Sequence, residues 1–116
     1  MLTTLVKRVS KARGAVFCDH EGESVELVIH DDALSEYELK VAGAQLASVW
    51  RALQESTRDS GAGALLELQV GCGAGSLLCR ALPDGYYVVL LVGQGGSGAS
   101  AAFALRSAAT RIASEL

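Results

Sequence analysis

The residues most suggestive of chemistry in this chain form a glycine-rich run, Gly93-Gln94-Gly95-Gly96-Ser97-Gly98. Its G-x-G-x-x-G spacing is that of dinucleotide-binding loops, in which a glycine turn between a strand and a helix lets the backbone approach a pyrophosphate. Such a site also needs a second parallel strand and an acidic residue about twenty positions further on, and the sequence reaches only Leu116. We therefore expect a flexible strand-to-helix connection with Ser97 or Ser100 as the helix cap. A small nucleotide-binding domain or enzyme that uses this glycine loop is kept as a remote alternative.

Two histidines stand beside carboxylates, in Asp19-His20-Glu21 and in His30-Asp31-Asp32. An imidazole next to a carboxylate suits metal binding or acid–base catalysis. Adjacent side chains on a strand point to opposite faces, however, and no third or fourth ligand is spaced to converge on either group. The sequence therefore predicts no metal site here.

The candidate nucleophiles for catalysis are Cys72 and Cys79. A catalytic thiol needs a positively charged and partly solvent-exposed environment. Only Arg80, next to Cys79, offers such a charge, and no G-x-S-x-G, P-loop or zinc motif is present. All three cysteines, Cys18 included, lie in or beside apolar stretches, which favours reduced, structural thiols. We expect no catalytic residue, no cofactor and no enzyme activity.

Length and composition indicate one domain, residues 1–116, because half of the 116 residues are hydrophobic and no linker divides them. The net charge is -3 and the ten Lys and Arg are scattered, so nucleic acid is not an expected partner. The start, Met1 to Arg8, lacks the apolar run of a secretion signal, and Arg80, Pro83 and Asp84 interrupt the most hydrophobic region. A cytoplasmic protein without membrane insertion is expected.

The first half of the chain predicts a helix, a hairpin and a second helix. Apolar residues recur at helical spacing from Leu2 to Val9, and the apolar runs 15–18 and 25–29 flank a polar turn. Ser35 followed by Glu38 has the form of a capping box, in which each residue satisfies a backbone amide of the other. A long helix should begin there.

Three strands and a last helix are predicted in the second half, at 64–70, 76–82, 86–92 and 100–116. The connections between these strands are too short for parallel crossovers, so the strands should run antiparallel. The segment 86–92 is apolar at nearly every position, which requires both of its faces to be covered. The prediction is an α+β fold, with a five-stranded antiparallel sheet sandwiched between helices in the order α-β-β-α-β-β-β-α.

The central helix carries two stripes. The bulky stripe, Leu39, Leu46, Val49, Trp50 and Leu53 with Ala42 in its gap, is predicted to cover the sheet. The neighbouring stripe consists mostly of small residues, which would let another backbone approach closely. The strand 64–70 follows a long connection and is a plausible sheet edge, which tends to find a partner. The predicted dimer or partner interface is therefore Lys40, Gly43, Ala44, Ala47, Arg51, Leu65, Glu67 and Gln69.

This order of elements, the hairpin sequence Gly14-Ala15-Val16-Phe17-Cys18-Asp19-His20-Glu21-Gly22 and the small residues of the central helix resemble the roadblock family of dynein light chain-like proteins. The resemblance spans nearly the whole chain. It implies the roadblock/profilin-like fold and a homodimer in which third strands pair edge to edge and central helices pack side by side. It also implies a role beside Ras-like small GTPases, as in the bacterial group related to gliding-motility GTPase regulators and their paralogues.

Two functions follow from this resemblance. The first is a non-catalytic homodimeric adaptor or regulator in a polarity or motility system, which binds the GTPase, its regulator or a paralogous roadblock protein. The alternative is a GTPase-activating protein, for which an arginine inserted in trans is the plainest mechanism. Arg51 and Arg58 are the candidates for that arginine.

Overall fold

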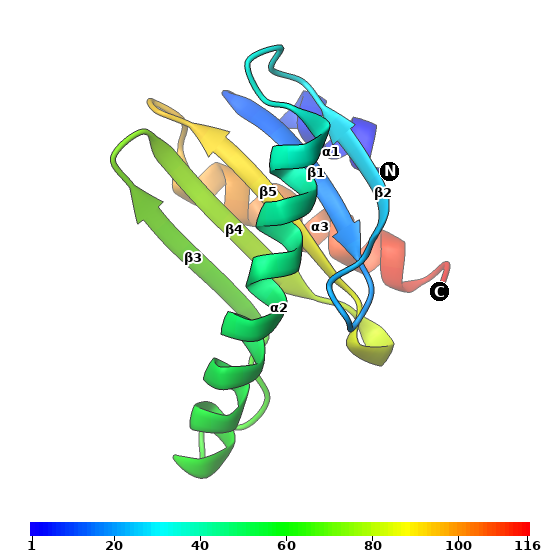
Figure 1. Ribbon diagram of the computed structural model, residues 1–116, viewed down its shortest axis with the longest axis vertical. Helices are drawn as coiled ribbons and strands as arrows, with labels where there is room; N and C mark the ends of the chain where they lie inside the picture. Colours follow the sequence, from blue (N-terminus) through cyan, green and yellow to red (C-terminus); the bar gives the residue numbers. More distant parts are fainter.

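The first helix and the hairpin form where the apolar pattern predicts them. The computed structural model describes residues 1–116 and places α1 at Leu2–Arg8, β1 at Ala12–Cys18 and β2 at Ser24–Ile29 (Figure 1). The Asp19 carboxylate accepts hydrogen bonds from two backbone amides of the hairpin turn, at 2.9 and 3.0 Å. Gly22 completes this turn with a φ of 89°, a conformation that favours glycine.

The capping box is confirmed at the start of α2, which spans Glu36–Asp59. The Ser35 hydroxyl accepts a hydrogen bond from the Glu38 amide at 3.0 Å, and the Glu38 carboxylate accepts one from the Ser35 amide at 3.2 Å. At 24 residues the helix is about 36 Å long. Its second half projects past the end of the sheet (Figure 1).

The second half of the chain forms β3 at Glu67–Cys72, β4 at Gly75–Ala81, β5 at Tyr87–Gly93 and α3 at Gly98–Ala113, with a short 3-10 turn before β5. The third strand begins later than the sequence predicts. Its pairing partner sets this limit, because β4 ends at Ala81 and so leaves residues 64 and 65 with nothing to pair with.

The strands are ordered β2-β1-β5-β4-β3, and every neighbouring pair is antiparallel. The apolar strand β5 therefore lies at the centre, with β1 on one side and β4 on the other. Its Val88 and Leu90 pack into one core and its Tyr87 and Val89 into another. The prediction that both faces of this strand are covered is confirmed, and β2 and β3 are the two edges.

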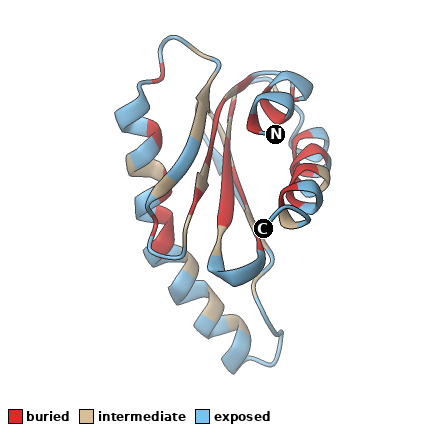
Figure 2. Ribbon diagram, turned by 90° about the vertical axis from the view of Figure 1, so that its right-hand side faces the viewer, coloured by how far each residue is buried: buried red, intermediate tan, exposed pale blue.

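Figure 2 shows the three layers, with α2 on one face of the sheet and α1 and α3 on the other. The core beneath α1 and α3 includes Leu5, Leu78 and Leu105, and the core beneath α2 includes Leu39 and Cys79. The predicted α+β fold and its element order are thus confirmed. None of the helices combines the length and apolarity needed to span a bilayer.

Candidate functional site

The small residues of α2 pack against the chain's own first hairpin. A Cβ on Gly43 would lie 2.8 Å from the Cys18 sulfur, and a Cβ on Gly22 would lie 3.0 Å from Cβ of Ala47 and 3.2 Å from Cα of Ala44. A backbone does approach this stripe closely, as the sequence predicts, but it belongs to the β1–β2 turn of the same molecule. The expectation that Gly43 and Ala47 form a free surface is wrong, because both are buried there.

A buried polar contact ties the same region together. The Tyr87 hydroxyl on β5 donates a hydrogen bond to the Gly43 carbonyl at 2.8 Å. Burial raises the pKa of the Cys18 thiol to about 11 and that of Cys79 to about 12. Both thiols are therefore protonated at neutral pH and pack as small apolar groups. Cys72, by contrast, is exposed at the end of β3.

The two histidine and carboxylate groups do not converge on a shared site. His20 is exposed and lies 3.7 Å from Glu21. The Arg13 guanidinium donates to the Asp31 carboxylate at 2.7 Å, and this hydrogen bond lowers the pKa of Asp31. Nowhere do three or more His, Cys, Asp or Glu side chains lie close enough to share a metal ion.

The glycine-rich run serves as the connection from β5 to α3. Ser97 is the cap, because its hydroxyl accepts a hydrogen bond from the Ser100 amide at 3.2 Å. Gly96 lies so close to β5 that a Cβ there would meet Val92 at 2.6 Å, which accounts for the glycine. Both neighbours of β5 are antiparallel to it, whereas a dinucleotide-binding unit needs parallel strands.

An apolar strip lies open between α2 and the β3 side of the sheet. Four exposed apolar side chains belong to it: Leu66 is 58%, Val49 48%, Val70 39% and Leu53 36% exposed. Between helix and strands is a hollow of about 380 Å³, lined mainly by apolar side chains: Ala42, Gln45, Leu46, Val49, Leu68, Val70, Cys72 and Leu77. We call these exposed side chains and this hollow the β3 strip.

The β3 strip exists because a single helix is too narrow for its face of the sheet. Five strands spaced about 4.8 Å apart are roughly 19 Å across, whereas a helix with its side chains is about 10 to 12 Å wide. Two helices, α1 and α3, cover the opposite face, but α2 is alone and packs mainly on β1 and β2. The β3 side of this face is therefore left without a helix that fully covers it.

The backbone of β3 is also open. Ala81 on β4 donates to the Leu66 carbonyl at 2.9 Å, and in an antiparallel ladder such bonded pairs recur at every second residue. Glu67, Gln69 and Gly71 therefore direct their amides and carbonyls to the free edge. The pairing of β3 has no bulge, and the strand carries no lysine or proline, the residues that commonly protect an edge.

The side chain of Glu67 turns to the other face, where it anchors β3 to α3. Both of its oxygens accept hydrogen bonds from Arg106, at 2.8 and 2.7 Å, and Arg80 lies 3.5 Å away. These contacts lower the pKa of Glu67, and the same carboxylate raises the pKa of Arg106. Its charge is thus neutralised within the molecule.

The structure separates the two groups of predicted interface residues. Lys40, Ala44 and Arg51 are exposed, but helical spacing places them on the flank of α2 that faces the hairpin turn, opposite the β3 strip. Lys40 pairs with Glu36 at 3.2 Å on that flank. Gln69 is exposed on β3, and Leu65 precedes that strand and is half-buried.

Sequence reasoning missed the flank of α2 beside β3, formed by Ala42, Gln45 and Val49. It assigned Val49 and Leu53 to the core, yet both are partly exposed to solvent. The sequence did contain a signal for this open surface. The strand β3 has apolar residues at alternate positions on the α2 face, and the single helix on that face must also cover the other strands. One helix against five predicted strands implies uncovered apolar surface.

Comparison with known proteins gives close matches in structure only. No family model and no curated protein matches the sequence. A Roadblock/LC7 domain from Streptomyces avermitilis superposes with a TM-score of 0.84 at 15% identity, over 96% of this chain and 90% of the other. The gliding protein MglB from Thermus thermophilus gives 0.86 at 18% identity, over 99% and 87%. MglC from Myxococcus xanthus gives 0.70 at 23% identity, over 99% and 95%.

This chain has the roadblock fold. The agreement extends over nearly the full length of both molecules in each comparison. The roadblock resemblance drawn from the sequence is therefore confirmed at the level of the fold. On this fold the β3 strip is an apolar surface that the protomer leaves open.

Proposed function

We propose that this chain is a non-catalytic homodimeric adaptor or regulator in a bacterial Ras-like small GTPase system of polarity or motility, acting in the cytoplasm. Its partner would be the GTPase, its regulator or a paralogous roadblock protein. Support for the system comes from the structural likeness to MglB and MglC, one of which is described as a gliding protein. Support for self-association comes from the β3 strip and is the stronger of the two.

Two-fold pairing through β3 would satisfy both open features at once. The free amides and carbonyls of Glu67, Gln69 and Gly71 would bond to the same groups of a second copy. The α2 helix of that copy would then lie beside Val49 and Leu53 and cover the strip. Transfer of apolar surface from water favours this contact by about 25 cal/mol per Å². The observation that carries the proposal is the single helix on this face of a five-stranded sheet.

The test replaces Val49 by glutamate, which places a charge in the strip. We expect the wild type to have the mass of a dimer in light scattering and Val49→Glu that of a monomer. The matched control is Arg51→Glu, also exposed on α2 but on the opposite flank, and it should remain a dimer. A monomeric wild type, or loss of the dimer in the control but not in Val49→Glu, would contradict the proposal.

The GTPase-activating alternative is favoured by one observation. Arg51 and Arg58 are exposed on α2, and neither takes part in an ion pair, so either is free to enter a partner's site. Phosphate release from a GTP-loaded Ras-like GTPase mixed with the protein separates the two functions. An adaptor binds without accelerating release, whereas an activator accelerates it and loses that effect when the contributing arginine becomes alanine.

A further inference from the structure

The negative charge of this molecule is concentrated around its other sheet edge. No lysine or arginine occurs between Arg13 and Lys40, and eight acidic residues lie in that segment: Asp19, Glu21, Glu23, Glu26, Asp31, Asp32, Glu36 and Glu38. The rest of the chain carries all ten basic residues and the other five acidic ones, a net charge of +5, and +5 with -8 gives the total of -3. The acidic segment contains the edge strand β2.

The backbone of β2 is open over its second half. The His30 amide donates to the Arg13 carbonyl on β1 at 2.9 Å. Because hydrogen-bonded pairs recur at every second residue of an antiparallel ladder, Val28 and Glu26 also bond to β1 through their backbone. Leu27 and Ile29 direct their amides and carbonyls away from the sheet. A bulge in the pairing falls at Val25, which leaves Glu26–Ile29 as the regular stretch that an added strand could join.

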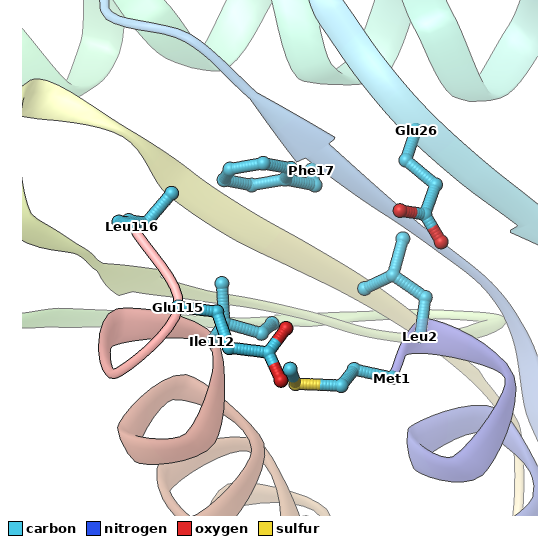
Figure 3. Close-up of a pocket in the computed structure, with 7 residues that line it drawn as sticks. All are labelled: Met1, Leu2, Phe17, Glu26, Ile112, Glu115 and Leu116. Carbon is cyan, nitrogen blue, oxygen red and sulfur yellow. The ribbon is translucent and has the colours of Figure 1, made fainter.

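Hollows flank this edge on both faces of the sheet. On the α1 and α3 face, one of about 200 Å³ has Leu2, Phe17 and Ile112 in its wall (Figure 3). A cavity of about 150 Å³ already holds a ligand as large as benzene, so this hollow is large enough for one long side chain. On the α2 face, another of about 260 Å³ lies between β2 and the start of α2.

The first hollow has an acidic rim over an apolar floor. Glu26 reaches it from β2 on one side and Glu115 from the turn after α3 on the other, where its carboxylate lies beside Met1, and the Phe17 ring forms another part of the wall (Figure 3). Neither carboxylate takes part in an ion pair or a side-chain hydrogen bond. The complementary group is a cation on an aliphatic stem, whose stem would lie on Phe17 and whose charge would meet the two carboxylates.

We propose that the edge of β2 at Glu26–Ile29 binds an extended, basic segment of a partner protein as a sixth strand. The segment's backbone bonds to Leu27 and Ile29, and its lysine or arginine opposite Glu26 enters the hollow on Phe17. This is the strand-addition mode of peptide recognition, in which backbone bonds give affinity and pockets for alternate side chains give specificity. A second copy of β2 does not fit, because its acidic residues would oppose these.

Binding of a nine-residue peptide of alternating valine and lysine, measured by fluorescence anisotropy, tests the proposal. We expect saturable binding that is about fivefold weaker for Glu26→Lys, because a cross-strand charge pair becomes a like-charge pair. The matched control is Glu55→Lys, the same change at an exposed site on α2, and it should bind as the wild type does. A peptide of alternating valine and glutamate should not bind.

Hydrogen exchange on the wild type locates the peptide without any variant. Added peptide should slow exchange at the Leu27 and Ile29 amides and leave those of Glu67 and Gln69 unchanged. Equal binding of an alternating glycine and lysine peptide, equal weakening in both charge variants, or protection at β3 in place of β2 would overturn the proposal. Light scattering on the same samples reports the dimer separately, so failure at one edge is distinguishable from failure at the other.

Discussion

Gly43 illustrates how a residue that lacks a side chain positions two elements at once. Its missing Cβ leaves space for the Cys18 sulfur, and its carbonyl accepts a hydrogen bond from the Tyr87 hydroxyl. The helix α2 can therefore approach β1 closely, and the hairpin turn at Gly22 closes over Ala44 and Ala47. In a helix interior, glycine costs up to about 1 kcal/mol relative to alanine. This close approach accounts for its presence here.

Replacing Gly43 by leucine should destabilise the protein by about 1 to 3 kcal/mol, the usual cost of adding a side chain to a packed interior. The added carbons have no space, because a Cβ alone would already lie 2.8 Å from the Cys18 sulfur. Urea unfolding measures the free energy. Ser48→Leu, at an exposed position of the same helix, serves as the control, and an equal loss in both variants would contradict the packing argument.

The elements α2 and β3 each leave part of their surface without a partner in the protomer. The helix covers β1 and β2 with one flank and leaves Val49 and Leu53 exposed on the other. The strand bonds to β4 through alternate residues and leaves the rest at the edge. The two edges of the sheet are protected differently. The pairing of β2 has a bulge and its segment carries several carboxylates, whereas the pairing of β3 has no bulge and its one carboxylate, Glu67, is paired with Arg106 and Arg80.

Proline at two neighbouring positions of β3 should separate dimerisation from folding. Gln69→Pro removes an amide that faces the free edge, so we expect a folded monomer. Leu68→Pro removes an amide bonded to β4 and should unfold or strongly destabilise the protomer. Light scattering reports the mass and circular dichroism the fold. A Gln69→Pro protein that remains dimeric would show that β3 is not the pairing edge.

Across the whole molecule, the open apolar surface lies at the β3 edge of the sheet, and the negative charge is concentrated around the β2 edge. The β3 strip is apolar, and the one carboxylate on β3, Glu67, is paired with Arg106 and Arg80. The segment around β2 is acidic, and the hollow beside this edge is lined by two unpaired carboxylates, Glu26 of β2 and Glu115 after α3. In the proposed arrangement β3 pairs with a second copy, and the β2 edge of each copy stays open to a basic partner.

Stability should depend on protein concentration if the strip is covered by a second copy. Because only the folded dimer buries the strip, mass action makes the midpoint of thermal unfolding rise with concentration. A hundredfold dilution should lower the midpoint of the wild type and leave that of Val49→Glu unchanged. A wild-type midpoint independent of concentration over that range would argue for a stable monomer.

The sequence by itself determined the elements and their order. Apolar periodicity, the Ser35 and Glu38 capping box and the short connections between strands are local signals, and they predicted every helix and strand to within a few residues. The all-apolar strand β5 also predicted a sheet covered on both faces. These features depend on neighbours along the chain, which the sequence shows directly.

Only the tertiary structure decided which face of α2 is free. From the sequence, either the small stripe of α2 or its Val49 flank could be buried or exposed. The apolar pattern of a helix shows which residues share a face, but it does not show what packs on that face. The outcome depended on the β1–β2 hairpin, which packs against the small residues. It also depended on the strand order, which places β3 at the edge of the sheet, while α2 packs mainly on β1 and β2. Contacts between residues far apart in the chain settle such questions.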